Sequence, residues 1–277
     1  MTTAVVGDRQ ATVRRGLPLV LAALLVATAI AYPLTSGAGR HAVTWAIVLL
    51  GAAVSVVHAG LSRGVRAGVS VFLLVAIMAV AFEAIGLATG FPYGTYSYGA
   101  GLGPTLLGVP FLVPLAWLMM AWPSWLLGEL LARPVRPGLR QPARIALAAA
   151  VFAGWDVVLD PQLVQAGYWT WRHPHPGLPG IPHVPLTNLA GWLLAGVALM
   201  ALLDLVLGVL TARGFVTDVP RIDATAPLTA LGWMTLGGAL AQAGWLGLPG
   251  SAAWGVGLAA PVVVALAVSR RSTGTNR

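Results

Sequence analysis

The sequence predicts an all-α fold, a polytopic integral membrane bundle of about eight transmembrane helices. Of its 277 residues, 58% are hydrophobic and 9% are charged, whereas about 25% of residues are charged in soluble domains. The mean hydropathy is +0.84. Apolar runs recur at about the length that crosses a hydrocarbon core about 30 Å thick. We expect a single membrane domain over 1–277, with short polar tails at 1–16 and 269–277, placed as a multi-pass protein in the cell membrane.

Eight apolar segments are the expected membrane helices. In chain order they cover about 17–34, 43–61, 69–89, 109–131, 145–160, 188–210, 226–246 and 251–268. The first has features of a signal peptide, because Arg14 and Arg15 precede an apolar stretch with small residues near its end. Since seven further segments follow it, we prefer the interpretation of a retained first helix.

The distribution of arginine predicts the direction of each helix. All sixteen basic residues are arginine, and the alternate connections that include both chain ends hold fourteen of them. The other connections hold two, Arg40 and Arg172. Because basic residues accumulate in cytoplasmic connections, both termini are predicted to be cytoplasmic. The arginines occupy several short gaps rather than one stripe, so a pI near 11.2 does not predict nucleic-acid binding.

Three acidic residues lie where a charge is costly, inside or at the end of apolar segments. Glu83 interrupts the third segment, while Asp156 and Asp160 close the fifth, and the predicted topology puts all three toward the outer face. The two aspartates are four residues apart, so their Cβ atoms are expected about 5–6 Å apart on one helix face. One carboxyl of such a pair is expected to keep a proton, which suits proton-transfer chemistry.

Each of these three residues also has a purely structural interpretation that competes with the catalytic one. Asp160 precedes Pro161 and could simply end its helix. Asp156 could pair with Arg172, and Glu83 could be a neutral side chain that bonds across helices.

The remaining acidic residues argue against two other classes of membrane protein. Glu129 and Asp204 fall nearer the predicted cytoplasmic side, and no second paired acidic motif accompanies Asp156 and Asp160. An intramembrane prenyltransferase needs two such motifs to hold Mg²⁺ on a diphosphate, so this class is an alternative only. No internal repeat is visible, which disfavours a secondary transporter.

Cysteine and histidine predict no metal site. The chain has no Cys, so thiolate ligands and thiol nucleophiles are excluded. His58 lies within the second segment and is expected to pack between helices or at the interface. Three histidines share the Pro-rich connection 161–187, where we expect no metal: His173, His175 and His183.

The two outer connections next to the acidic residues have an unusual composition. Residues 90–108 contain six Gly, two Pro and three Tyr but no charge, which suits a re-entrant or tightly packed lid. Trp169 and Trp171 lie in the other, 161–187. Such aromatics also form ordinary interfacial belts, but their concentration in two connections favours the mouth of a pocket. Asn188, at the start of the sixth segment, is either a helix N-cap or part of the site.

Taken together, five motifs resemble the CruF-type membrane proteins of carotenoid biosynthesis. They are Glu83-Ala-Ile-Gly-Leu-Ala-Thr-Gly-Phe-Pro-Tyr-Gly-Thr-Tyr-x-Tyr, Leu107-Gly-Val-Pro, Trp155-Asp-x-x-Leu-Asp-Pro, Trp169-x-Trp and Val184-Pro-Leu-Thr-Asn-x-x-Gly-Trp. The resemblance covers about 78–195. The family contains carotenoid 1′,2′-hydratases and bisanhydrobacterioruberin hydratase. Tyr93, where Phe is expected, and His183, where Gly is usual, depart from its pattern and bear on substrate choice.

The resemblance implies a hydro-lyase that needs no cofactor and no metal. Such an enzyme adds water across the terminal C1′–C2′ double bond of an acyclic or monocyclic carotenoid, dissolved in membrane lipid, and forms a tertiary alcohol. Asp156 or Asp160 would donate the proton and Glu83 would act as base. The expected substrate-binding residues are Tyr93, Tyr96, Tyr98, Trp155, Trp169, Trp171, Asn188 and Trp192. A non-catalytic membrane protein that binds a carotenoid or another isoprenoid is the main alternative.

Overall fold

The computed structural model describes residues 2–181, 183–216 and 223–274, and most of them are helical. The long helices are α1 (Thr2–Ala31), α2 (Gly37–Arg63), α3 (Val65–Thr89), α4 (Leu112–Leu131), α5 (Pro137–Gln165), α6 (Leu186–Ala212) and α9 (Pro249–Gly274). Between α6 and α9 runs one helical rod, composed of α7 (Thr225–Gly232), the π-helical turn η3 (Trp233–Gly237), α8 (Gly238–Ala241) and the π-helical turn η4 (Gln242–Leu246). Two 3-10 turns, η1 (Tyr32–Leu34) and η2 (Ala100–Leu102), lie in connections.

The described helices occupy the eight places expected from the apolar segments, in the expected order. Within the described residues, five segments are long and apolar enough to cross a membrane: Gly16–Leu34, Gly37–Arg63, Val65–Thr89, Pro137–Gln165 and Leu186–Ala212. The fold is therefore all-α and membrane-like. Membrane crossing by the other helices, and the cytoplasmic position of both termini, stay predictions. The expected polar tail at 1–16 continues α1 as helix from Thr2.

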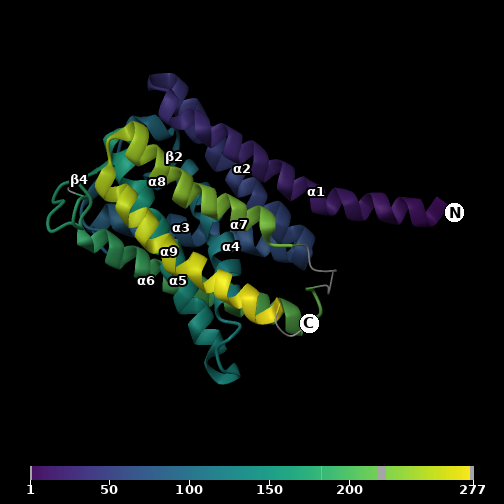
Figure 1. Cartoon of the computed structure of the whole chain (residues 1–277). Helices are drawn as coiled ribbons and strands as arrows, with labels where there is room; N and C mark the ends of the chain where they lie inside the picture. Colours follow the sequence, from purple (N-terminus) through teal and green to yellow (C-terminus); the bar gives the residue numbers. More distant parts are fainter. Residues whose placement is uncertain (1, 182, 217–222, 275–277) are drawn as a thin grey trace.

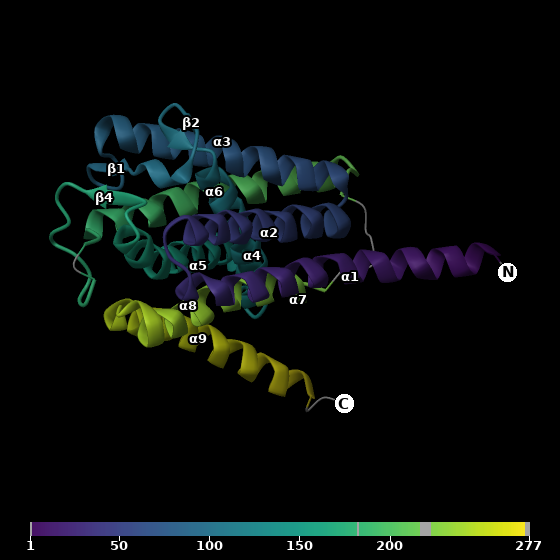
Figure 2. The ribbon, with the colours of Figure 1, turned by 90° about the horizontal axis from the view of Figure 1, so that it is seen from above.

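Helix α4 forms the centre of the bundle. Nearly all of its side chains between Leu112 and Gly128 are buried, and it packs against α2, α3, α5 and α7. Small residues allow the closest of these approaches: a Cβ atom on Gly128 would lie only 2.7 Å from the Cβ atom of Ala148 in α5. Outside this centre, α1 runs along α2 and α9 runs along α5 (Figure 1, Figure 2).

Two connections far apart in the sequence join at one end of the bundle. Strand β1 (Tyr96–Tyr98) pairs antiparallel with β4 (Trp169–Trp171), so that Tyr96 lies opposite Trp171 and Tyr98 lies opposite Trp169. A second short pair joins β2 (Thr105–Leu106) to β3 (Val109–Pro110). The start of α1 and the end of α9 lie at the opposite end of the bundle (Figure 1). The 90–108 connection is thus a packed cover over the helix ends.

Alternation along the paired strands decides which side chains face the bundle. Successive side chains of a strand point to opposite faces, so residues two apart share one face. Tyr96 and Tyr98 of β1 therefore share a face with Trp169 and Trp171 of β4, and the ring of Tyr98 lies edge-on to that of Trp169 with 6.0 Å between centroids. Four aromatic rings from two connections thereby form one surface above α3 and α5.

Candidate active site

A cavity of about 250 Å³ lies beneath the β1–β4 cover, among α2, α3, α4, α5 and α6. All three suspected carboxyls line it, and all three are buried: Glu83 from α3, and Asp156 and Asp160 from α5. The eight predicted substrate-binding residues line the same cavity: Tyr93, Tyr96, Tyr98, Trp155, Trp169, Trp171, Asn188 and Trp192. The structure thus brings together every residue of the predicted site, while their catalytic roles stay predictions.

Glu83 is held by three donors, none of which is charged. Tyr96 Oη donates to Glu83 Oε2 at 2.5 Å and Tyr98 Oη donates to the same oxygen at 2.7 Å. Trp117 Nε1 of α4 donates to Oε1 at 3.3 Å. Burial raises the pKa of both tyrosine hydroxyls above the ordinary tyrosine value, so they keep their protons and remain donors. All three partners donate, so the Glu83 carboxyl is the acceptor in each of these hydrogen bonds.

One amide joins the two aspartates. Asn188 Nδ2 of α6 donates to Asp156 Oδ2 at 2.9 Å and to Asp160 Oδ2 at 2.5 Å. Trp169 Nε1 donates to the other oxygen of Asp160, Oδ1, at 3.1 Å. Asp156 Oδ1 receives no donor within the described part of the chain. Each carboxyl oxygen of Asp160 therefore accepts a hydrogen bond. Asp156 has one oxygen, Oδ1, without a donor, and this oxygen can carry the proton that the two carboxyls share.

The structural interpretations of this pair are wrong in two respects. Asp160 does not end its helix, because α5 continues through Pro161 as far as Gln165. Asp156 does not pair with Arg172, since the ion pairs among the described residues are Arg63–Glu129 and Arg144–Asp204.

The N-cap interpretation of Asn188 is also wrong. The N-cap of α6 is Pro185, and Asn188 lies inside the first turn of the helix. Its side chain therefore points away from the orphan backbone N–H groups of the helix start and toward α5. The sixth helix starts within two residues of the predicted position, and its Asn188 side chain lines the cavity.

Buried aromatic rings form the wall between the carboxyls and the bundle core. Trp192 contacts Trp117, Trp155 and Tyr93, with ring centroids 4.9, 6.5 and 5.9 Å apart. Trp171 Nε1 donates to the backbone carbonyl of Tyr93 at 3.1 Å, which ties β4 to the turn after α3. The Tyr93 hydroxyl lies in the buried wall with no hydrogen-bond partner among the described residues. The cavity therefore offers π faces and very few polar groups beyond the carboxyl cluster.

Trp117 is a site residue that the sequence did not identify. It lies within the apolar 109–131 run, where a tryptophan has the pattern of an ordinary core residue. Its indole reaches Glu83 only because α4 packs against α3, and that packing is not encoded in any local motif. The cavity also reaches η1 and the η3–η4 rod, which the motifs did not indicate.

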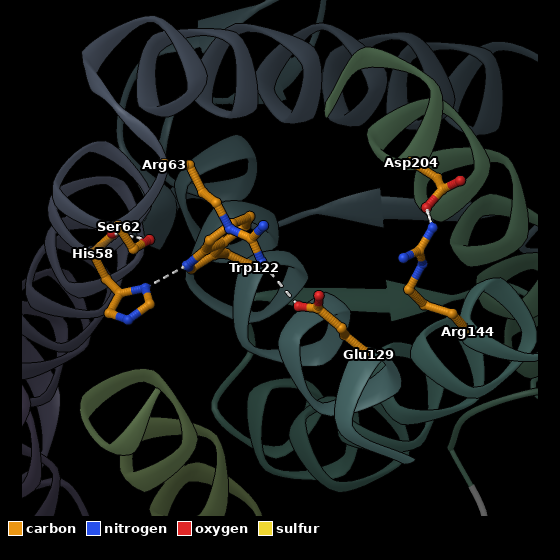
Figure 3. A network of polar contacts seen from close by, with 7 residues as sticks. All are labelled: His58, Ser62, Arg63, Trp122, Glu129, Arg144 and Asp204. Atoms are coloured by element: carbon orange, nitrogen blue, oxygen red, sulfur yellow. Dashed lines mark hydrogen bonds and ion pairs between the residues drawn. The ribbon is translucent and has the colours of Figure 1, made fainter. Parts of the chain in front are cut away.

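Two further acidic residues of the helices, Glu129 and Asp204, lie outside the cavity, and each pairs with an arginine. Glu129 Oε2 accepts from Arg63 Nη2 at 3.0 Å, and Asp204 pairs with Arg144 (Figure 3). Gln141 also donates to Asp204 at 2.7 Å. Glu129 and Asp204 therefore form ion pairs between packed helices and are not part of the cavity.

His58 lies buried in the contact between α2 and α4. His58 Nδ1 accepts from Trp122 Nε1 at 3.0 Å across the α2–α4 contact (Figure 3), in agreement with the packing interpretation. Among the described residues, no group of three or more His, Asp and Glu side chains is arranged to hold a metal ion.

Comparison with known proteins gives the family. The chain matches the family described as "Carotenoid biosynthesis protein" over residues 43–264, a wider stretch than the 78–195 of the motifs. It is 36% identical over 142 residues to a bisanhydrobacterioruberin hydratase of Haloarcula japonica. That alignment covers 50% of this chain and 45% of the relative, so the chain spans less than half the length of this relative. No solved structure matches the chain.

Proposed function

Since the chain belongs to the carotenoid biosynthesis protein family, we propose that it is a carotenoid hydratase. The proposed reaction adds water across the terminal C1′–C2′ double bond of an acyclic or monocyclic carotenoid and forms a tertiary alcohol. The name of the relative from Haloarcula japonica supports a hydratase. The observation that carries the proposal is the group of three buried carboxyls in one aromatic cavity, none of which has an arginine partner among the described residues.

The aspartate pair is the proposed proton donor. Two carboxyls that share one amide donor in an apolar site are best satisfied with one proton between them. We assign that proton to Asp156, because Asp160 already accepts a hydrogen bond on each oxygen. Transfer of the proton to C2′ breaks the π bond and leaves a tertiary cation at C1′. General acid catalysis of this kind contributes about 10²–10⁴-fold in rate.

Aromatic faces stabilise the cation in this scheme. A desolvated cation over an aromatic ring gains about 0.5–2 kcal/mol, and Trp155, Trp169, Tyr96 and Tyr98 all line the cavity beside the carboxyls. This contribution matters because a carboxylic acid is a weak donor for an isolated alkene. The fixed rings and the ionised partner Asp160 therefore have to lower the energy of the cation itself.

Glu83 is the proposed base for the attacking water. Its oxygens accept three hydrogen bonds from neutral donors, which favours the carboxylate before the reaction. Attack of the water oxygen on C1′ forms the C–O bond, and the released proton moves to Glu83. Return of that proton to the aspartate pair closes the cycle, so no cofactor is consumed. The substrate comes from the lipid phase, and its partners in this scheme are membrane lipid and water.

A carotenoid-binding protein without catalysis is the second candidate, because the aromatic cavity alone would suit it. The two functions are separated by producing the chain in a bacterium that makes an acyclic carotenoid and analysing the extract by mass spectrometry. A product heavier by one water is expected from the wild type, and its yield should collapse in Asp156→Asn and Glu83→Gln. Asp204→Asn, outside the cavity, is the matched control and should keep the specific activity. Full hydration by both site variants would overturn the acid–base assignment.

A further inference from the structure

The cavity extends beyond the carboxyl cluster toward one side of the bundle. In addition to the site residues, its lining includes the end of α1 with η1, from Ala29 to Leu34, and members of the η3–α8–η4 rod from Trp233 to Trp245. These two segments are distant in sequence and lie in contact, with η1 beside η4. One continuous space therefore joins the carboxyls to this side of the molecule.

Exposure identifies where the cavity opens. Most of its lining is buried or half-buried, but four lining side chains have more than half of their surface exposed. They are Ile30 at 51%, Leu34 at 67%, Leu240 at 61% and Trp245 at 59%. All four are apolar, and all four belong to the α1–η1 end or to the α8–η4 rod. The opening is thus apolar on both sides, as expected for one that faces hydrocarbon rather than water.

The size of the cavity decides what can be inside it. Pockets that enclose a drug-sized ligand measure about 300–1,000 Å³, and this cavity measures about 250 Å³. A carotenoid is larger than such a ligand, so only its reacting end fits beside the carboxyls. The rest of the carotenoid has to extend out of the protein. It can do so only where the apolar lining of the cavity is continuous with the exterior.

The rod on one side of the opening has a local geometry that suits this role. Two π-helical turns flank the short α8 segment, and π turns occur frequently at functional sites. Gln242 anchors the rod to α5, with its Nε2 donating to the Val158 carbonyl at 2.5 Å and to Gln162 Oε1 at 3.3 Å. Gly238 and Ala241 of the rod line the cavity, while Leu240 and Trp245 line it and remain exposed at the rim.

We propose that the gap between η1 and the α8–η4 rod is a lateral portal, which holds the polyene tail of the substrate while its end group reaches the carboxyls. This proposal rests on the proposed function for the identity of the end group. The occupant is a long, linear, conjugated hydrocarbon, because the lining is continuous from the exposed rim to the reacting groups. An acyl chain of a lipid has no end group that the three carboxyls would bind or protonate, so it is not the expected occupant.

The absence of cysteine provides a direct test. Leu34→Cys and Leu240→Cys each introduce the only thiol of the chain, on either side of the portal. Leu24→Cys and Leu236→Cys are the matched controls, because they are exposed leucines of α1 and η3 that do not line the cavity. The purified full-length variants, in a Glu83→Gln background that leaves the substrate unconverted, are labelled with a maleimide with and without an acyclic polyene.

The proposal expects the polyene to slow labelling of the two portal thiols at least about tenfold and to leave the two controls unchanged. In the background with Glu83 intact, attachment of a bulky maleimide to a portal thiol should abolish conversion of the polyene, whereas labelled control variants should stay active. Equal labelling with and without polyene at all four positions would overturn the portal. Protection at the portal without hydration by the wild type would instead overturn the proposed reaction and leave the portal intact.

Discussion

Replacement of Asn188 by leucine tests whether the two aspartates act as a positioned pair. The Asn188 amide lies 2.9 Å from Asp156 Oδ2 and 2.5 Å from Asp160 Oδ2, and donates to both. Leucine has a similar shape but no donor, so each carboxyl loses that hydrogen bond inside a buried site. The packing of α6 against α5 is expected to survive, because the volume at the contact changes little.

The size of the effect follows from the charge of the two acceptors. A hydrogen bond to an ionised group contributes about 1.5–3 kcal/mol and one to a neutral group about 0.5–1.5 kcal/mol. With one carboxyl of the pair protonated, the two bonds together contribute about 2–4.5 kcal/mol. Since about 1.36 kcal/mol of transition-state stabilisation is a factor of ten, Asn188→Leu should lower the hydration rate about 30- to 2,000-fold.

Initial rates of alcohol formation, measured by chromatography on equal amounts of purified protein in detergent micelles, are the appropriate assay. Thr187→Val is the matched control, because Thr187 is the preceding residue of α6 and donates to the Tyr93 carbonyl at 3.3 Å rather than to an aspartate. Size-exclusion chromatography and thermal unfolding establish that both variants are folded. If folded Asn188→Leu hydrates its substrate as fast as Thr187→Val, the aspartates do not depend on the amide and the reasoning is refuted.

Other predictions concern neighbouring contacts and a distant one. Trp169→Phe should lower the hydration rate about tenfold or more, because Asp160 Oδ1 loses a donor at 3.1 Å; an unchanged rate in the same assay would contradict this. Glu129→Gln should leave the rate per folded molecule unchanged and lower the free energy of unfolding by at most about 1 kcal/mol, because its pair is partly exposed. Gly191→Ala should destabilise the fold by about 1–3 kcal/mol, since a Cβ atom there would lie 2.6 Å from a buried aromatic ring. Gly208→Ala on the same helix has no neighbouring atom within 4 Å, and comparable unfolding temperatures for the two variants would show that the overpacking argument is wrong.

The positions of the helices and the identity of the carboxyls were accessible from sequence for the same physical reason. In an apolar chain a hydrophobic segment has to be a helix, and an acidic residue within it is costly. Few such residues occur, so Glu83, Asp156 and Asp160 stand out without any structure. The spacing of four between the aspartates then places them on one face of α5, and both do line the cavity.

The partners of these carboxyls were not accessible, because they depend on how distant segments pack. Trp117 looks like any core tryptophan until α4 is placed against α3. The role of Asn188 was ambiguous because a polar residue near a helix start has the pattern of an N-cap, and only the observation that Pro185 precedes the helix resolves it. The pairing of β1 with β4 is likewise a contact between connections about 70 residues apart, and their compositions suggested a pocket mouth without indicating a sheet.

Pro161 shows why the end of the fifth segment was misjudged. A proline cannot donate to the carbonyl four residues earlier and usually ends a helix, so a boundary at 160 is the natural prediction. In the protein α5 continues to Gln165. Side chains of neighbouring helices can satisfy the backbone groups around such a proline in an apolar environment. Here the Gln242 amide donates to the Val158 carbonyl, which is adjacent to the Val157 carbonyl that Pro161 leaves without its usual donor. A single-segment pattern cannot contain that information.

The acidic residues of the site differ from Glu129 and Asp204 in the groups that contact them. This difference separates the two sets more clearly than their predicted depth in the membrane does. Glu129 and Asp204 each form an ion pair with an arginine. Within the described part of the chain, the donors to Glu83, Asp156 and Asp160 are hydroxyl, indole and amide groups. A neutral donor favours the carboxylate less strongly than a neighbouring arginine does, so the group can hold a proton at one step and release it at the next. An alkene hydratase needs this property, because its acid and its base have to return to their starting states in every turnover.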